Sequence, residues 1–168
     1  MAITLVQAWW FLPFVLPICF FVAFTDVSEM RITNQAVIAL VLVFLIIGLI
    51  PLTLPEYGMR LVQLIGVLVF GILLNAAGVM GAGDAKFAAA AAPFIAPADL
   101  RFIIIIFTAN LLAAFVTHRL VKYSPLRRIA PDWKSWEMGK KFPMGLALGG
   151  TLAAYLVMGA GLWAWIIQ

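Results

Sequence analysis

Two aspartates in the sequence lie directly beside long apolar stretches, where an ionised side chain is costly and is usually functional. Asp26 follows the apolar stretch 8–25, and Asp84 precedes an alanine-rich stretch in the segment GAGDAKFAAAAAP (81–93). Two carboxylates that share a partly desolvated site cannot both ionise easily, so the pair holds one proton between them. The ionised acid can then accept a proton from water while the protonated acid donates one to a peptide carbonyl. Such a pair is suited to hydrolysing a peptide bond without a metal, a cofactor or a covalent nucleophile.

Both acids also have plain structural interpretations. An aspartate directly before a helix is a good N-cap, which stabilises a helix by about 1 kcal/mol, and an acid at the end of a helix can simply be solvated. Gly81 and Gly83 allow unusual backbone dihedrals and the close approach of an extended substrate strand, or they simply form a turn. Lys86, two residues after Asp84, is placed to modulate the local charge. The coincidence of both acids on one membrane face favours chemistry.

The composition indicates that lipid is the solvent of this chain. Of its 168 residues, 65% are hydrophobic and 11% are charged, and the mean hydropathy is +1.12. A soluble domain of this size cannot bury so much apolar surface. A spanning helix needs about 20 mostly apolar residues, and six stretches approach that length: 8–25, 35–54, 61–80, 85–96, 102–117 and 143–167. We predict an all-α, polytopic membrane protein with a bundle of about six transmembrane helices and a single domain, residues 1–168.

The fourth stretch, 85–96, is short and rich in alanine. Small side chains allow a helix to pack closely among other helices in a membrane. Pro93 predicts a kink or an early end of this helix.

The basic residues predict the orientation of the bundle. If both termini face outward, only Arg60 and Arg101 lie in outer loops, and the inner loops hold Arg31, Lys86, Arg119, Lys122, Arg127, Arg128, Lys134, Lys140 and Lys141. Because lysine and arginine concentrate in cytoplasmic loops, we expect periplasmic termini and a basic cytoplasmic segment at about residues 118–142. The tryptophans at positions 9, 10, 163 and 165 would then form an outer aromatic belt. In this topology Asp26 and Asp84 both lie at the inner face.

The two acidic motifs resemble those of the type IV prepilin (leader) peptidases, which belong to the GxGD class of membrane aspartic proteases. GAGDAK (81–86) resembles the G-x-G-D motif with its frequent following lysine. DVSEMRITN (26–34) resembles the other signature, an aspartate followed by a short loop and I-P-N. Ile32 and Asn34 match that signature, but Thr33 stands where proline is usual, which we expect to affect loop stiffness more than chemistry. FPMGLALGG (142–150) resembles the start of the family's last helix.

The resemblance implies that Asp26 and Asp84 are the catalytic pair at the cytoplasmic boundary of about six helices. It implies an endopeptidase of the bacterial inner membrane that cleaves the short basic leader of prepilins or pseudopilins, typically after a glycine. No metal, cofactor or nucleic-acid partner is expected. The remaining motif positions would support the site through the backbone or the local charge: Gly81, Gly83, Lys86 and Asn34.

Larger members of the family carry an extra cytoplasmic domain, often with a four-cysteine metal site, that is associated with N-methylation of the new terminus. Cys19 is the only cysteine here, and no such insertion separates the first two apolar stretches. The chain therefore resembles the small, peptidase-only branch that serves tight-adherence (Tad/Flp) pili.

Other polar residues have structural interpretations that we favour. Asn34 is placed to cap the second helix, Asn75 and Asn110 to join helices by hydrogen bonds, and His118 to cap the end of the fifth helix. Glu29 shares a helix face with Asp26 if the first helix continues, and a solvated acid is the favoured interpretation.

The basic run RRIAPDWKSWEMGKK (127–141) is typical of a topology determinant. A sharper hypothesis is an amphipathic flap that guides a membrane-tethered substrate to the acids. Four of its side chains would then dip into the membrane interface: Ile129, Trp133, Trp136 and Met138.

Three other functions remain open at this stage. A small ion-coupled transporter could use the carboxylates as proton sites, although such acids usually lie near the membrane midplane. A purely structural membrane subunit would use both acids as caps. A presenilin-like or signal-peptide-peptidase-like enzyme is disfavoured because Thr25, and not tyrosine, precedes Asp26.

Overall fold

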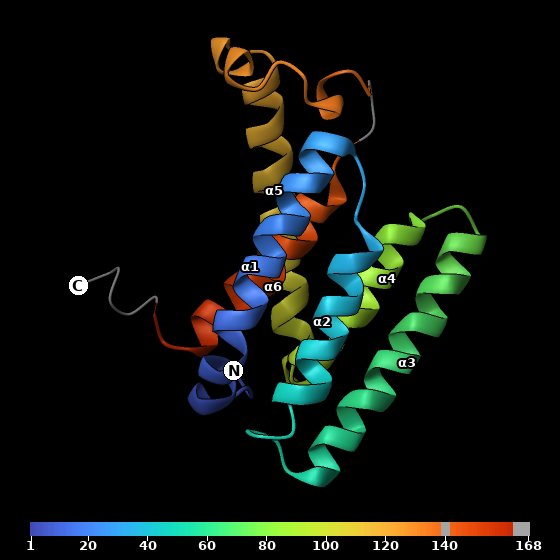
Figure 1. The fold of residues 1–168 in the computed structure, drawn as a ribbon, viewed down its shortest axis with the longest axis vertical. Helices are drawn as coiled ribbons and strands as arrows, with labels where there is room; N and C mark the ends of the chain where they lie inside the picture. Colours follow the sequence, from blue (N-terminus) through green and yellow to red (C-terminus); the bar gives the residue numbers. More distant parts are fainter. Residues whose placement is uncertain (139–141, 163–168) are drawn as a thin grey trace.

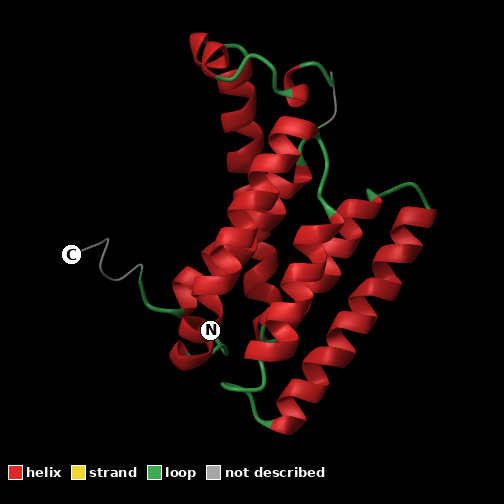
Figure 2. Cartoon of the chain, viewed as in Figure 1, coloured by secondary structure: helices red, strands yellow, loops and turns green. Residues whose placement is uncertain are grey.

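The computed structural model describes residues 1–138 and 142–162, and all regular elements among these residues are helical (Figures 1 and 2). The described residues form six α-helices: α1 (Leu5–Glu29), α2 (Asn34–Ile47), α3 (Leu54–Ala76), α4 (Ala82–Ala91), α5 (Leu100–Lys122) and α6 (Met144–Gly159). Short 3-10 turns accompany them: η1 (Ala92–Phe94), η2 (Pro97–Asp99), η3 (Pro125–Ile129) and η4 (Lys134–Trp136). The predicted all-α fold of six helices is confirmed.

Three of the helices are long and apolar enough to cross a membrane: α1, α3, and α5 together with the preceding turn, Pro97–Lys122. The apolar helices α2 and α6 have 14 and 16 residues. Helix α4 has only 10 residues and ends in the turn η1 that contains Pro93, which confirms the predicted early end. These lengths and compositions are those of a membrane protein.

Successive helices run alternately up and down the bundle (Figure 1). The end of α1, the start of α4 and the segment 125–138 therefore lie at one end, and the chain start and the first turn of α3 lie at the other (Figure 1). Asp26 and Asp84 thus share an end of the bundle with most of the basic residues, as the sequence predicted.

Helix α6 packs closely on α1 through small residues. A side chain at Gly149 would place its Cβ 2.9 Å from the carbonyl oxygen of Cys19, so only a glycine lets the two backbones approach this closely. Gly71 of α3 lies similarly against Ala85 of α4, where an added Cβ would be 3.0 Å from the Ala85 Cβ. Close contact between small residues is how helices associate in lipid, because the lipid removes most of the hydrophobic drive for packing.

Helices α3 and α5 lie at the periphery and present their apolar side chains outward. In α3 only Arg60 and Gly71 are buried, and in α5 only Ala114 and His118. A soluble protein would not expose such continuous apolar faces. These faces fit a hydrocarbon solvent, and the buried apolar side chains come mainly from α1, α2, α4 and α6.

A buried polar network holds the end of the bundle opposite the two acids. Asp99 accepts hydrogen bonds from the backbone N–H groups of Ala2 and Ile3 and, at 2.8 Å, from the Tyr155 hydroxyl. Arg60 is 2% exposed and donates to the carbonyl of Pro93 and to Glu56. The sequence placed Arg60 in an outer loop, whereas the structure buries it inside α3.

Some sequence predictions concern residues outside the described ranges. These are Trp163 and Trp165 of the aromatic belt, the basic residues Lys140 and Lys141, and the last part of the stretch 143–167.

Candidate active site

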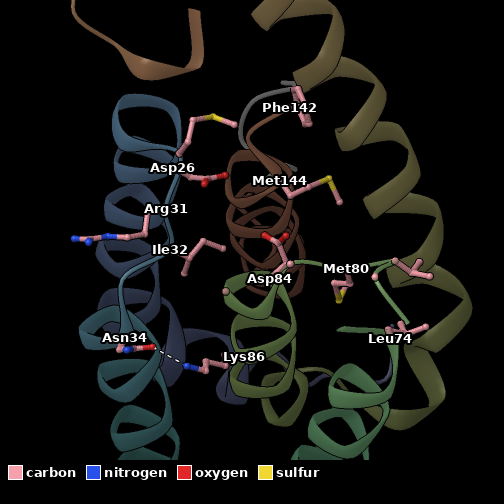
Figure 3. A pocket seen from close by; sticks show the side chains of 15 residues that line it. Asp26, Arg31, Ile32, Asn34, Leu74, Met80, Asp84, Lys86, Phe142 and Met144 are labelled. Atoms are coloured by element: carbon pink, nitrogen blue, oxygen red, sulfur yellow. Dashed lines mark hydrogen bonds between the residues drawn. The ribbon is translucent and has the colours of Figure 1, made fainter. Parts of the chain in front are cut away.

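A cavity of about 880 Å³ opens at the end of the bundle where α1 ends and α4 begins. Figure 3 shows the Asp26 and Asp84 side chains extending into it from these two helices. The cavity is lined by Asp26, Met30, Arg31, Ile32, Asn34, Leu74, Gly78, Val79, Met80, Gly81, Gly83, Asp84, Lys86, Phe142 and Met144. The two acids that lie far apart in the sequence therefore line one cavity.

Asp26 lies in the last turn of α1 and is 5% exposed. Its Oδ2 accepts a hydrogen bond from the backbone N–H of Gly145, at 2.5 Å. The helix ends just beyond, because Met30 adopts the left-handed conformation (φ 56°, ψ 40°) and its N–H bonds to the Asp26 carbonyl. This turn sends the chain into α2 within four residues and keeps Asp26 at the rim of the bundle.

Asp84 is half-buried in the first turn of α4. The N-cap of this helix is Gly81, so the interpretation of Asp84 as the N-cap is wrong. Burial raises the pKa of the Asp84 carboxyl above its usual range, and the backbone N–H of Gly81 opposes that rise. A carboxyl group of this kind holds a proton at a higher pH than a solvated aspartate does.

Neither glycine of the motif has an unusual backbone conformation, so the predicted dihedral freedom is wrong, whereas the close approach of a substrate strand stays a prediction. Gly81 has φ −65° and ψ 145°, which any residue adopts, and Gly83 is helical. A Cβ at Gly81 would lie 2.7 Å from Oδ2 of Asp84, whereas a Cβ at Gly83 would lie 3.4 Å from the Cβ of Ile32. Gly81 therefore leaves room for the Asp84 carboxylate itself.

Lys86 joins α4, which carries Asp84, to the start of α2. Its Nζ donates to Oδ1 of Asn34 at 3.1 Å (Figure 3). The predicted capping role of Asn34 is wrong, because Thr33 is the N-cap of α2 and its hydroxyl accepts from the Ala36 N–H. The threonine at the family's usual proline position thus caps the helix, and Asn34 remains available to bind Lys86.

The other predicted polar contacts are partly confirmed. Asn110 of α5 donates to the Ala147 carbonyl and the Thr151 hydroxyl of α6, so it joins two helices as predicted. Asn75 donates to the Met80 carbonyl in the loop that follows its own helix, so its predicted interhelical bond is wrong. Helix α1 continues through Glu29, as considered, and Glu29 pairs with Arg31 at 3.6 Å on the surface.

The basic segment packs onto the end of α1 that carries Asp26. His118 is buried and stacks on Trp136 at 5.0 Å between ring centroids, and its ring nitrogens have no hydrogen-bond partner among the described residues, so its predicted capping role is wrong. Trp136 is buried too, which contradicts its place in an interfacial flap, while Ile129 and Met138 are exposed as that hypothesis requires. Trp133 contacts Phe24 of α1 edge to face, two residues before Asp26.

Sequence reasoning missed the contribution of α6 to this site. Gly145 donates to Asp26, and Phe142 and Met144 line the cavity. The small residues at positions 145 and 149 were the available signal, because glycines four residues apart predict a close helix contact in a membrane. Nothing in the sequence identifies Asp26 as the residue that is contacted.

The described ranges contain no group of three or more histidine, cysteine, aspartate or glutamate side chains that could hold a metal ion. A family model described as the type IV leader peptidase family matches residues 13–118, a range that includes both aspartates. No curated protein and no solved structure gave a significant match.

Proposed function

Because the chain belongs to the type IV leader peptidase family, we propose that it is a membrane aspartic endopeptidase that removes the leader of pilin-type precursors. The observation that carries this proposal is the cavity that Asp26 and Asp84 share at one end of the bundle. Family membership makes the chain a protease. The acid pair supplies a chemical reason for the aspartic class.

The proposed reaction uses one ionised and one protonated carboxyl group. The ionised acid takes a proton from water as the water oxygen bonds to the scissile carbonyl carbon, and the protonated acid gives its proton to the carbonyl oxygen. As the resulting diol collapses, one of its hydroxyl groups returns a proton to the acid that protonated the carbonyl oxygen, the C–N bond breaks, and the amine leaves with a proton from the acid that first accepted one. The raised pKa of Asp84 supports this chemistry, because one member of such a pair must keep a proton near neutral pH.

The surroundings of the cavity support a substrate that lies in the membrane. Apolar residues, among them Leu74, Val79 and Met80, line the cavity beside the acids. A precursor whose basic leader precedes an apolar helix could lie in lipid with its cleavage junction at the acids. Since the positive-inside rule orients the bundle with this end toward the cytoplasm, we place the reaction at the cytoplasmic face of the bacterial inner membrane, with both termini periplasmic.

The short connection after α1 supports a peptidase-only enzyme of the tight-adherence type. Helix α1 ends at Glu29 and α2 begins at Asn34, so these two helices have no inserted domain between them. We propose that residues 1–168 form one peptidase domain and that residues 118–142 form its basic cytoplasmic segment.

A cleavage assay tests the proposed function. The purified protein in detergent is incubated with a synthetic precursor that has a basic leader, a glycine junction and an apolar helix, and mass spectrometry identifies the products. Asp26→Asn and Asp84→Asn keep the side-chain size and should abolish turnover. Glu29→Gln is the matched control, because Glu29 lies one turn after Asp26 and is half exposed, and it should cleave normally. A folded Asp26→Asn or Asp84→Asn variant that cleaves at the wild-type rate would refute the paired-acid mechanism.

A further inference from the structure

The start of α6 touches the Asp26 carboxyl group in two ways. The Gly145 N–H donates to Oδ2 at 2.5 Å in a buried setting. A Cβ at Gly145 would lie 2.8 Å from the Cβ and 2.9 Å from the Oδ2 of Asp26. Any other residue at this position would push the carboxyl group away or separate α6 from α1.

The Gly145 amide is a strong and fixed donor. It belongs to the second residue of α6, and the first N–H groups of a helix have no partner within the helix. These groups also carry the positive end of the helix dipole, which favours a carboxylate. Because the helix sets the direction of the N–H, the bond holds one oxygen of Asp26 and leaves the other for water or the second acid.

We propose that Gly145 is a positioning residue for the reaction: its amide and its missing side chain hold the Asp26 carboxyl group in the cavity shared with Asp84. This inference rests on the proposed function. It adds a third helix to a site that the two acidic motifs alone would build from α1 and α4.

The charged side chains around Asp26 come from elements other than α6. Those that line the cavity are Arg31, Asp84 and Lys86; Glu29 lies one turn further along α1, and Lys134 of η4, which packs on α1, is exposed. The first turn of α6 contributes no titratable side chain. A change at Gly145 therefore alters the hydrogen bond and the position of Asp26 without removing a charge.

Gly149 provides a matched control on the same face of α6. It lies one turn after Gly145 and also packs on α1, where an added Cβ would be 2.9 Å from the Cys19 carbonyl oxygen. Gly145→Ala and Gly149→Ala thus introduce the same methyl group into the same helix contact with similar crowding. Only the methyl group at position 145 contacts a carboxyl group, that of Asp26.

Steady-state cleavage of the synthetic precursor across a pH series separates the two variants. Both should lower the melting temperature. Gly145→Ala should lower kcat by about tenfold or more, since displacing a reacting group by about 1 Å costs roughly a hundredfold, while KM changes little. Its acidic limb should move by about one pH unit toward higher pH, because the ionised carboxylate loses a charge-assisted hydrogen bond. Gly149→Ala should keep the wild-type pH profile. A wild-type profile in folded Gly145→Ala, or the same shift in Gly149→Ala, would overturn the inference.

A measurement on the wild-type chain covers the case in which Gly145→Ala does not fold. With ¹⁵N-glycine labelling, the amide resonance of Gly145 should titrate with pH in the wild type and become independent of pH in Asp26→Asn. A Gly145 resonance that ignores pH in the wild type refutes the inference. Because this readout needs no turnover, it remains valid if the precursor is not cleaved, which would refute only the proposed function.

Discussion

Replacing Gly81 with alanine should impair the site through a single steric contact. The backbone at Gly81 suits alanine, so the substitution causes no backbone strain. The added Cβ would lie 2.7 Å from Oδ2 of Asp84, where an ordinary contact is 3.4 Å or more. The carboxylate must therefore move by about 0.7 Å, judged against that ordinary contact distance. A displacement of about 1 Å costs roughly a hundredfold in rate, so we expect kcat to fall between about 10-fold and 100-fold, or about 1.4–2.7 kcal/mol.

Gly83→Ala is the internal control for this prediction. Its Cβ would lie 3.4 Å from the Cβ of Ile32, and alanine favours a helix over glycine by about 1 kcal/mol. We expect this variant to keep kcat close to the wild-type value and to melt no lower. The assay is cleavage of the synthetic precursor, with kcat and KM measured separately and the melting temperature recorded for each variant. The steric reasoning is refuted if Gly83→Ala loses as much kcat as Gly81→Ala, or if Gly81→Ala is fully active.

Two further predictions concern Asp84 and its helix. Because the pKa of Asp84 is raised in the folded state, its ionised form destabilises the fold at neutral pH, and this destabilisation disappears as the pH falls through the folded-state pKa. The Asp84→Asn variant should therefore have a higher melting temperature than the wild type at pH 7 and lose this advantage near pH 4. A difference in melting temperature that does not vary with pH contradicts the assignment. Lys86→Met removes the 3.1 Å bond to Asn34, and the loss of about 1 kcal/mol should lower kcat/KM about fivefold. Asn34→Ala should have the same effect, and the double variant should fall no further; additive losses would show that the two side chains act separately.

The fold was predictable from the sequence because the apolar stretches are long and are separated by charged or turn-forming residues. The short fourth helix followed from Pro93, and the shared end of Asp26 and Asp84 followed from the alternation of the helices (Figure 1). Patterns of this kind depend only on length and hydropathy. Such patterns predict how far along a helix a residue lies, but not which neighbouring helix its side chain faces.

The details of the site were less predictable because they depend on packing between helices. The sequence assigned dihedral freedom to Gly81, whereas the structure assigns it space beside Asp84. It assigned Asn34 to a cap that Thr33 provides. In both cases the local pattern allowed two roles, and a neighbouring helix or residue decided between them.

Buried polar residues at the opposite end were missed for the same reason. Arg60 was counted as a loop cation, but it is buried because the Pro93 carbonyl and Glu56 accept its hydrogen bonds. Asp99, at the end of η2, is buried because Tyr155 and the backbone of residues 2 and 3 donate to it. A charged side chain is stable in the interior only when its hydrogen-bond partners are present, and most of those partners are distant in sequence.

The uneven distribution of these polar contacts has a mechanical consequence. The end that holds Asp99 and Arg60 ties the chain start, α3, η1 and α6 together through buried hydrogen bonds. At the other end, a surface bond between Lys86 and Asn34 links α2 to α4, and the Gly145 amide links α6 to α1. Elements with few buried bonds separate at a lower free energy than those with many. The bundle should therefore separate first at the end that holds Asp26 and Asp84, while the end that holds Asp99 and Arg60 stays closed and acts as the hinge.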